Sequence, residues 1–123
     1  DFRAAVALGA CRVLNLKEGR VGGLLESLRL LAFARERGIP VWSGGMDETG
    51  IGRAVNIHLQ TVEGFTLPGD TSETSRYFRE DLVEPPVVLD ADGFVEVPFG
   101  DGIGVEVVPE RLEKLTLRTE RLR

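Results

Sequence analysis

A lysine at the end of a short apolar run is the first residue that could do chemistry. Residues 11–17 read Cys-Arg-Val-Leu-Asn-Leu-Lys, and as a strand they would place side chains alternately on two faces. One face carries Leu14 and Leu16, and the other carries Val13, Asn15 and Lys17. In a parallel α/β barrel the inward face carries catalytic groups at the carboxyl ends of the strands. Lys17 is therefore a candidate acid/base residue, and the alternative is an ordinary lysine at a solvated strand end.

Two glycine-rich loops supply the other candidate residues. One reads Gly-Gly-Met-Asp-Glu at 44–48, and the other reads Gly-Asp-Thr-Ser at 69–72. Glycine has no Cβ and lets a ligand approach the backbone closely, and free backbone N–H groups can hold a carboxylate. The candidate substrate-binding residues are Gly44, Gly45, Met46, Glu48 and Asp70. The competing interpretation is that these loops are ordinary connectors whose acidic side chains lie in solvent.

The elements that must position these residues repeat along the chain. Short apolar strands are expected at Val13, Val41 and Phe65. These residues are 28 and 24 positions apart. Each is followed by a polar or glycine-rich loop and then by a helical pattern. This rhythm predicts an α/β protein with a parallel sheet, and it brings the three loops to one face.

The helical segments have their own expected faces and ends. A first helix is expected over 2–8, a second over 23–37 and a third over 51–59. The second would bury a stripe of Leu24, Leu28, Leu31 and Ala32, and the third a stripe of Ile51, Ala54, Val55 and His58. Asp70, with Glu73 three residues later, is expected to cap a short fourth helix.

The pattern changes after Pro85-Pro86. Residues 87–89 and 94–97 flank an Asp-Gly turn and predict a hairpin. Residues 106–108 and 115–117 alternate like further strands. We therefore divide the chain into βα units over 1–84 and a β-rich segment over 85–123.

Composition narrows the class of protein. The 123 residues are 42% hydrophobic with a net charge of −5. The chain has no run of basic residues that would favour nucleic-acid binding. No apolar run approaches the ~20 residues of a membrane span, so we expect no membrane partner. The single cysteine excludes an internal disulfide and favours a reducing compartment, which we take as the cytoplasm. No metal-ligand cluster, GxSxG, Walker A or CxxC motif is present.

Four motifs in order resemble one known family. They are GACRVLNLK at 9–17 followed by Gly22-Gly23, GGMDETGIGRA at 44–54, FTLPGDTS at 65–72 with SRY at 75–77, and PFGDGIG at 98–104. Together they closely resemble the o-succinylbenzoate synthases and N-acylamino acid racemases of the enolase superfamily. The resemblance runs from Asp1 to about Gly104.

The resemblance implies a fold and an activity. The fold is the last three βα units of a TIM-like barrel, followed by a segment that returns to a capping domain. Family members abstract the proton α to a carboxylate in a small-molecule substrate, and a divalent metal, usually magnesium, stabilises the enediolate. Lys17 matches the lysine of the sixth strand, Gly44, Gly45 and Met46 match the seventh-strand loop, and Asp70 lies in the eighth-strand loop. The resemblance further implies a lyase or isomerase, a place in menaquinone biosynthesis and a homo-oligomer.

The chain departs from the family in one large respect. The capping domain, the first five strands, the paired lysines of the second strand and all metal ligands have no counterpart in these 123 residues. The resemblance therefore makes the chain the C-terminal part of an enzyme that is completed by an N-terminal part, and predicts that the isolated chain is inactive. The alternatives are another epimerase or cycloisomerase of the superfamily, and a non-catalytic fragment that docks on a partner.

Overall fold

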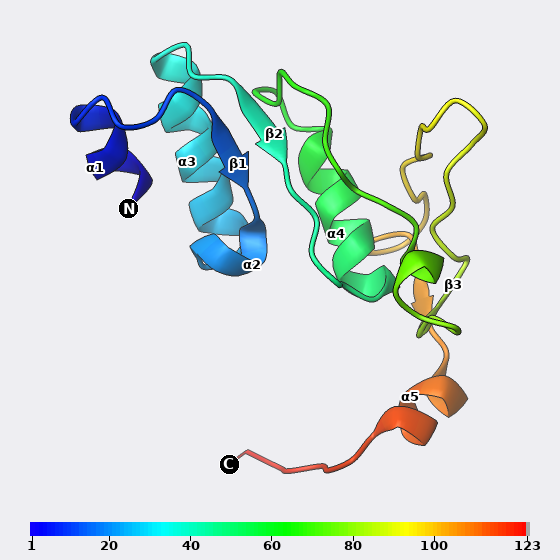
Figure 1. Ribbon diagram of the computed structural model, residues 1–123. Coiled ribbons are helices and arrows are strands. Elements are labelled where there is room, and N and C mark those ends of the chain that lie inside the picture. Colours follow the sequence, from blue (N-terminus) through cyan, green and yellow to red (C-terminus); the bar gives the residue numbers. More distant parts are fainter. Residues whose placement is uncertain (123) are drawn as a thin grey trace.

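The computed structural model describes residues 1–122, and its N-terminal half contains two consecutive βα units. The elements here are α1 (Phe2–Ala7), β1 (Leu14–Leu16), α2 (Glu18–Val21), α3 (Leu24–Glu36), β2 (Val41–Ser43) and α4 (Gly50–Gln60). Figure 1 shows β1 and β2 side by side, with α3 running along them. The short helix α2 was not predicted. It is a single turn that ends at Gly22, whose φ of 102° lies in the left-handed region.

The two N-terminal strands are parallel, as the spacing predicts. Leu14 pairs with Val41 and Leu16 pairs with Ser43. The predicted strand faces are confirmed, because Leu14 and Leu16 are buried against α3 while Asn15 is exposed. The main hydrophobic core consists of Leu14, Leu16, Leu30, Leu31, Ala34, Val41 and Leu59.

The buried stripes of the two long helices differ from the predicted ones. In α3 the buried residues are Ser27, Leu30, Leu31 and Ala34. Ser27 is accommodated because its hydroxyl donates to the Gly23 carbonyl at 2.9 Å. In α4 the buried residues are Gly50, Arg53, Ala54, Asn56, Ile57 and Leu59. Of the predicted stripes only Leu31 and Ala54 are buried, because apolar spacing does not reveal that polar residues such as Ser27 and Arg53 occupy the buried faces.

The predicted third strand at 65–67 is wrong. The N–H groups of Thr66 and Leu67 both donate to the Val41 carbonyl, at 3.0 and 3.1 Å, so no regular ladder forms. Pro68 follows and has no N–H to continue the pairing. The predicted Asp70 cap is also wrong, because the next element is a 3₁₀ turn, η1 (Thr74–Arg76), that Glu73 precedes.

The C-terminal part is less β-rich than predicted. A two-stranded antiparallel sheet joins β3 (Val83–Glu84) to β4 (Glu106–Val107). The predicted hairpin is present as one bridge between Leu89 and Val95. The predicted strand at 115–117 is wrong, because α5 (Pro109–Leu115) occupies part of it, with Pro109 at a position that favours helix initiation. The division at residue 85 stays a prediction.

The molecule exposes more surface than a complete domain of its size. Its accessible surface is 8815 Å², whereas a compact folded monomer of 13.5 kDa exposes about 6,500 Å². Figure 1 shows the reason in part, because α5 and the C-terminal residues extend away from the body. Within residues 1–122 no helix is both long and apolar enough to cross a membrane.

Candidate functional site

The carboxyl ends of β1 and β2 lie side by side and bring Lys17 to the first glycine loop. The parallel register aligns Leu16 with Ser43, and the Gly44 N–H continues the pairing by donating to the Leu16 carbonyl at 2.9 Å. Lys17 follows immediately, and its amine donates to the Gly45 carbonyl at 2.5 Å. The predicted convergence of the lysine and this loop is thus present.

Gly44 is needed for close approach. A Cβ built on Gly44 would lie 2.8 Å from the Lys17 Nζ atom and 2.9 Å from its Cε atom. Any other residue would push the amine away from the loop. The glycine therefore sets how near Lys17 comes to the backbone of the second strand.

Asp70 returns to the same loop from beyond α4. Its N–H donates to the Ser43 carbonyl at 3.2 Å, and its Oδ1 atom accepts the Gly45 N–H at 2.5 Å. The two polar groups of Gly45 are therefore held by an acidic and a basic side chain. All three predicted loops do meet, although only two of them follow regular strands.

Met46 is held in the same way by a second pair of charges. The Glu48 Oε2 atom accepts the Met46 N–H at 2.7 Å, and the Arg53 Nη2 atom donates to the Met46 carbonyl at 2.7 Å. These two side chains also pair with each other, with 3.1 Å between Arg53 Nη2 and Glu48 Oε2. We call the two residues Gly45 and Met46 the clamped segment.

Sequence reasoning missed Arg53. It lies four residues before Ile57 on α4, and both are buried. The signal was therefore available, because an arginine on the apolar face of a helix needs a partner. The sequence does not show that Glu48 folds back toward the helix. Without this partner, Arg53 would be expected to lie in solvent.

Glu18 adds a further charge next to Lys17. One of its carboxylate oxygens is buried without a hydrogen-bond partner among the described residues. Burial raises the pKa of the Glu18 carboxyl above its ordinary value, and the nearby Glu48 carboxylate acts in the same direction. Its own backbone N–H group, the Arg53 guanidinium and the Lys17 amine oppose this shift.

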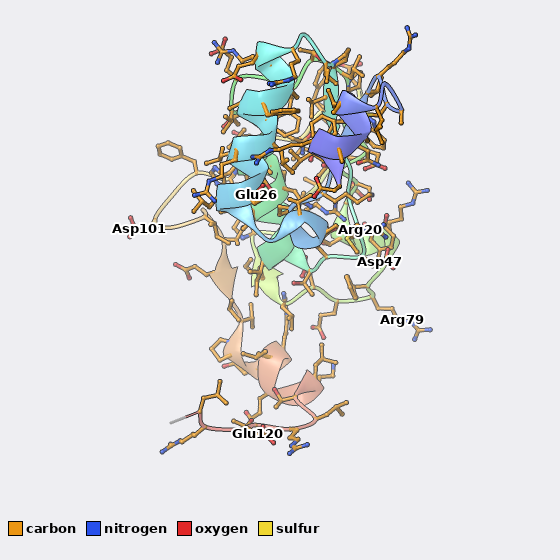
Figure 2. The ribbon with its side chains drawn as sticks, turned by 90° about the vertical axis from the view of Figure 1, so that its left-hand side faces the viewer. Arg20, Glu26, Asp47, Arg79, Asp101 and Glu120 are labelled. Carbon is orange, nitrogen blue, oxygen red and sulfur yellow. The ribbon has the colours of Figure 1, made fainter. Side chains whose placement is uncertain are left out.

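The side chains beside the clamped segment differ in direction. Asp47 is exposed, and Figure 2 shows it at the outer edge of the molecule. Met46 and Asp70 are both exposed, so both can meet a ligand from the open side. The described residues contain no group of three or more His, Cys, Asp or Glu side chains that could hold a metal ion.

Comparison with known proteins shows the family of the chain. The family model described as Enolase C-terminal domain-like matches residues 1–111. The chain belongs to this family. It is 53% identical to an N-succinylamino acid racemase from Thermus thermophilus and 47% identical to an o-succinylbenzoate synthase from Geobacillus kaustophilus, with 94% of the chain covered in both cases. The resemblance to the enolase superfamily is thereby confirmed.

The structural comparison gives the same result for the fold. A crystal structure of an enolase superfamily member from Listeria innocua superposes with a TM-score of 0.90 at 41% identity and covers 97% of the chain. The chain spans about a third of that protein, 32% of its length, and 31% of each of the two curated relatives. The family has the mixed helix and strand content that was predicted.

Proposed function

We propose that this chain supplies strands six to eight of a TIM-like barrel to an enzyme that abstracts the proton α to a carboxylate. The reaction is the dehydration that forms o-succinylbenzoate, the racemisation of N-acylamino acids, or both. The observation that carries the proposal is the Lys17 amine, which lies at the joined ends of two parallel strands against the Gly45 carbonyl.

Lys17 is the proposed catalytic residue. In racemisation it exchanges a proton with the α-carbon from one face of the substrate. In the dehydration its positive charge stabilises the negative charge that develops on the substrate. Both roles need an amine held in one place, and its contact with a backbone carbonyl provides this.

The loop residues are proposed to shape the substrate side of the site. Gly44 and Gly45 leave room beside the backbone, and Met46 offers an exposed apolar side chain. The Gly45 N–H already donates to Asp70, so we assign Gly45 a role in shape rather than in holding a carboxylate. Asp70 is kept as a substrate-side residue, with its Oδ1 atom engaged by the Gly45 N–H. Glu48, whose Oε2 atom accepts the Met46 N–H, is proposed to act on the substrate side through the loop backbone rather than by contact.

The remaining parts of the proposal concern the complete protein. We propose magnesium as its metal, with ligands outside these 123 residues, as the family resemblance implies. We further propose a small carboxylate substrate, a homo-oligomer in the cytoplasm, a place in menaquinone biosynthesis, and a C-terminal segment from residue 85 that returns to a capping domain.

An assay of the complete protein tests the proposal. It is incubated with the hydroxy-acid precursor of o-succinylbenzoate and, separately, with each enantiomer of an N-succinylamino acid, with magnesium and after chelation. We expect turnover of at least one substrate class, lost on chelation and restored by magnesium. Inactivity on both classes alongside turnover of a dipeptide or a muconate would favour the alternative epimerase or cycloisomerase.

A further inference from the structure

The Arg53 side chain carries a buried charge that the proposed reaction does not use. Its side chain is 0% exposed, and that of its partner Glu48 is 18% exposed. The Nε and Nη1 atoms of Arg53 are buried with no hydrogen-bond partner among the described residues. Arginine is almost never fully buried unless it is paired. The buried ion pair with Glu48 therefore needs an explanation.

Stability alone explains the pair poorly. Taking two charges out of water costs free energy, and apolar residues of similar volume often stabilise a fold equally well. Here two of the arginine nitrogens remain without partners, which adds to the cost. The side-chain hydrogen bonds that the pair makes to other residues all go to Met46.

The pair fixes a peptide group that Lys17 uses. The Gly45 carbonyl and the Met46 N–H belong to one planar peptide group. Glu48 accepts the N–H side of that plane, and Lys17 donates to its carbonyl side. Turning the plane would therefore move the acceptor of the Lys17 amine.

Arg53 holds this arrangement from two sides. Its Nη2 atom donates to the Met46 carbonyl, which belongs to the following peptide group. The same atom pairs with the Glu48 carboxylate that accepts the Met46 N–H. Arg53 therefore fixes both peptide groups of the clamped segment. A Cβ built on Gly45 would lie only 2.6 Å from its Nη1 atom. The guanidinium thus packs directly against the clamped segment.

We propose that Glu48 and Arg53 are positioning residues for Lys17, acting through the clamped segment. This inference rests on the proposed function, because it assigns the pair to the proton transfer that Lys17 performs. Neither side chain needs to touch the reacting atoms for this role. What they set is the place of the amine relative to the substrate α-carbon.

Proton exchange measured separately for the two enantiomers tests this role. The complete protein is incubated in D₂O with each enantiomer of N-succinylphenylalanine, and α-deuterium incorporation is followed. Lys17→Ala first identifies the enantiomer whose exchange depends on Lys17. Glu48→Gln and Arg53→Met are then expected to slow exchange of that enantiomer by about 10-fold or more, while the other enantiomer changes by less than about 2-fold.

A matched pair of control variants comes from the surface. Arg35 and Glu63 form an ion pair at 2.9 Å in which both side chains are exposed. Arg35→Met and Glu63→Gln make the same chemical changes and should leave the ratio of the two exchange rates unchanged. The double variant Glu48→Gln/Arg53→Met should slow exchange no further than Arg53→Met alone, because the two residues act as a unit.

The outcomes separate the inference from the function on which it rests. Equal slowing of both enantiomers, with a lowered melting temperature, would overturn the positioning role in favour of a structural one. If Arg53→Met does not fold, Glu48→Gln decides alone, and an unchanged exchange ratio in that variant overturns the inference. Wild-type protein that exchanges neither enantiomer would overturn the proposed racemase function, and the inference would fall with it.

Discussion

At the scale of single residues, the site is organised around backbone groups that charged side chains hold. Lys17 donates to a neutral carbonyl, and Asp70 accepts the N–H of the same residue, Gly45. Glycine is required there because a guanidinium nitrogen occupies the space where a Cβ would begin. The loop thus depends on a backbone that charged side chains can approach closely.

Gly45 gives the first residue-scale prediction. In the complete enzyme, Gly45→Asp should lower kcat/KM by about 10-fold or more or change substrate preference, because it adds bulk and charge against Arg53 and beside the substrate. Steady-state kinetics on both substrate classes measure this. Gly45→Ala is the matched control that adds bulk without charge. Its kcat/KM should lie between those of the wild-type enzyme and Gly45→Asp. Unchanged kinetics for both variants would remove Gly45 from the site.

Glu18 gives a prediction about pH. Burial raises its pKa in the folded state above the ordinary value of 4.5, so folding favours the protonated carboxyl. This contribution to stability is fully present below the unfolded pKa and is lost as the pH rises through the folded pKa. Glu18→Gln should therefore stabilise the complete protein near pH 7, and the gain should shrink as the pH falls toward the ordinary value of 4.5 and vanish below it. Thermal melts across this range check it. A gain that is independent of pH would contradict the assignment.

At the scale of elements, the first two βα units explain why Lys17 and the clamped segment meet. Parallel pairing of β1 and β2 aligns their carboxyl ends, and the packing of β1 on α3 fixes which face each side chain takes. Leu16 is fully buried in that contact, one residue before Lys17. Stability of this packing and position of the amine are therefore linked.

A truncation at Leu16 tests the packing. Leu16→Ala in the complete protein should lower the free energy of unfolding by about 2–5 kcal/mol, because it leaves a cavity between the strand and α3. Denaturant unfolding measures the change. Leu25→Ala removes the same atoms from a side chain that is 64% exposed and should cost much less. Equal losses at the two positions would contradict the assigned core.

The elements also show where sequence reasoning succeeds and where it stops. The strand at Val41–Ser43, the long helices and the position of Lys17 directly after β1 follow from local pattern. The strand expected at 65–67 failed because two N–H groups share one carbonyl, a tertiary detail that no local pattern carries. The strand expected at 115–117 is absent because Leu115 ends a helix that begins at Pro109. The alternating apolar residues there did not indicate this helix. Arg53 was missed because its partner lies across a loop.

At the scale of the whole molecule, the chain has the surface of an incomplete structure. It exposes about a third more area than a compact monomer of its mass, and β1 and β2 form a two-stranded parallel sheet, although parallel sheets are found almost only with both faces covered. Phe99, Leu117 and Leu122 are almost fully exposed. These surfaces suit a chain that spans about a third of its relatives.

This surface predicts how the isolated chain behaves. Residues 1–123 expressed alone should be poorly soluble, oligomeric or partly unfolded, and inactive, because exposed strand edges and apolar side chains favour association. Light scattering and thermal denaturation measure this, with the complete protein as the control. A monomer with a sharp cooperative melt would contradict the expectation.

The central claim is that Lys17 is the catalytic lysine, and its substitution tests this most directly. Lys17→Ala in the complete enzyme should abolish racemisation while exchange from the opposite face stays measurable for one enantiomer. Turnover in the synthase reaction should fall by about 10²-fold or more through lost charge stabilisation. Lys17→Arg should restore little, because it keeps the charge but not the shape of the amine. Steady-state kinetics with solvent deuterium exchange on each enantiomer is the measurement, and normal racemisation by Lys17→Ala would contradict the account.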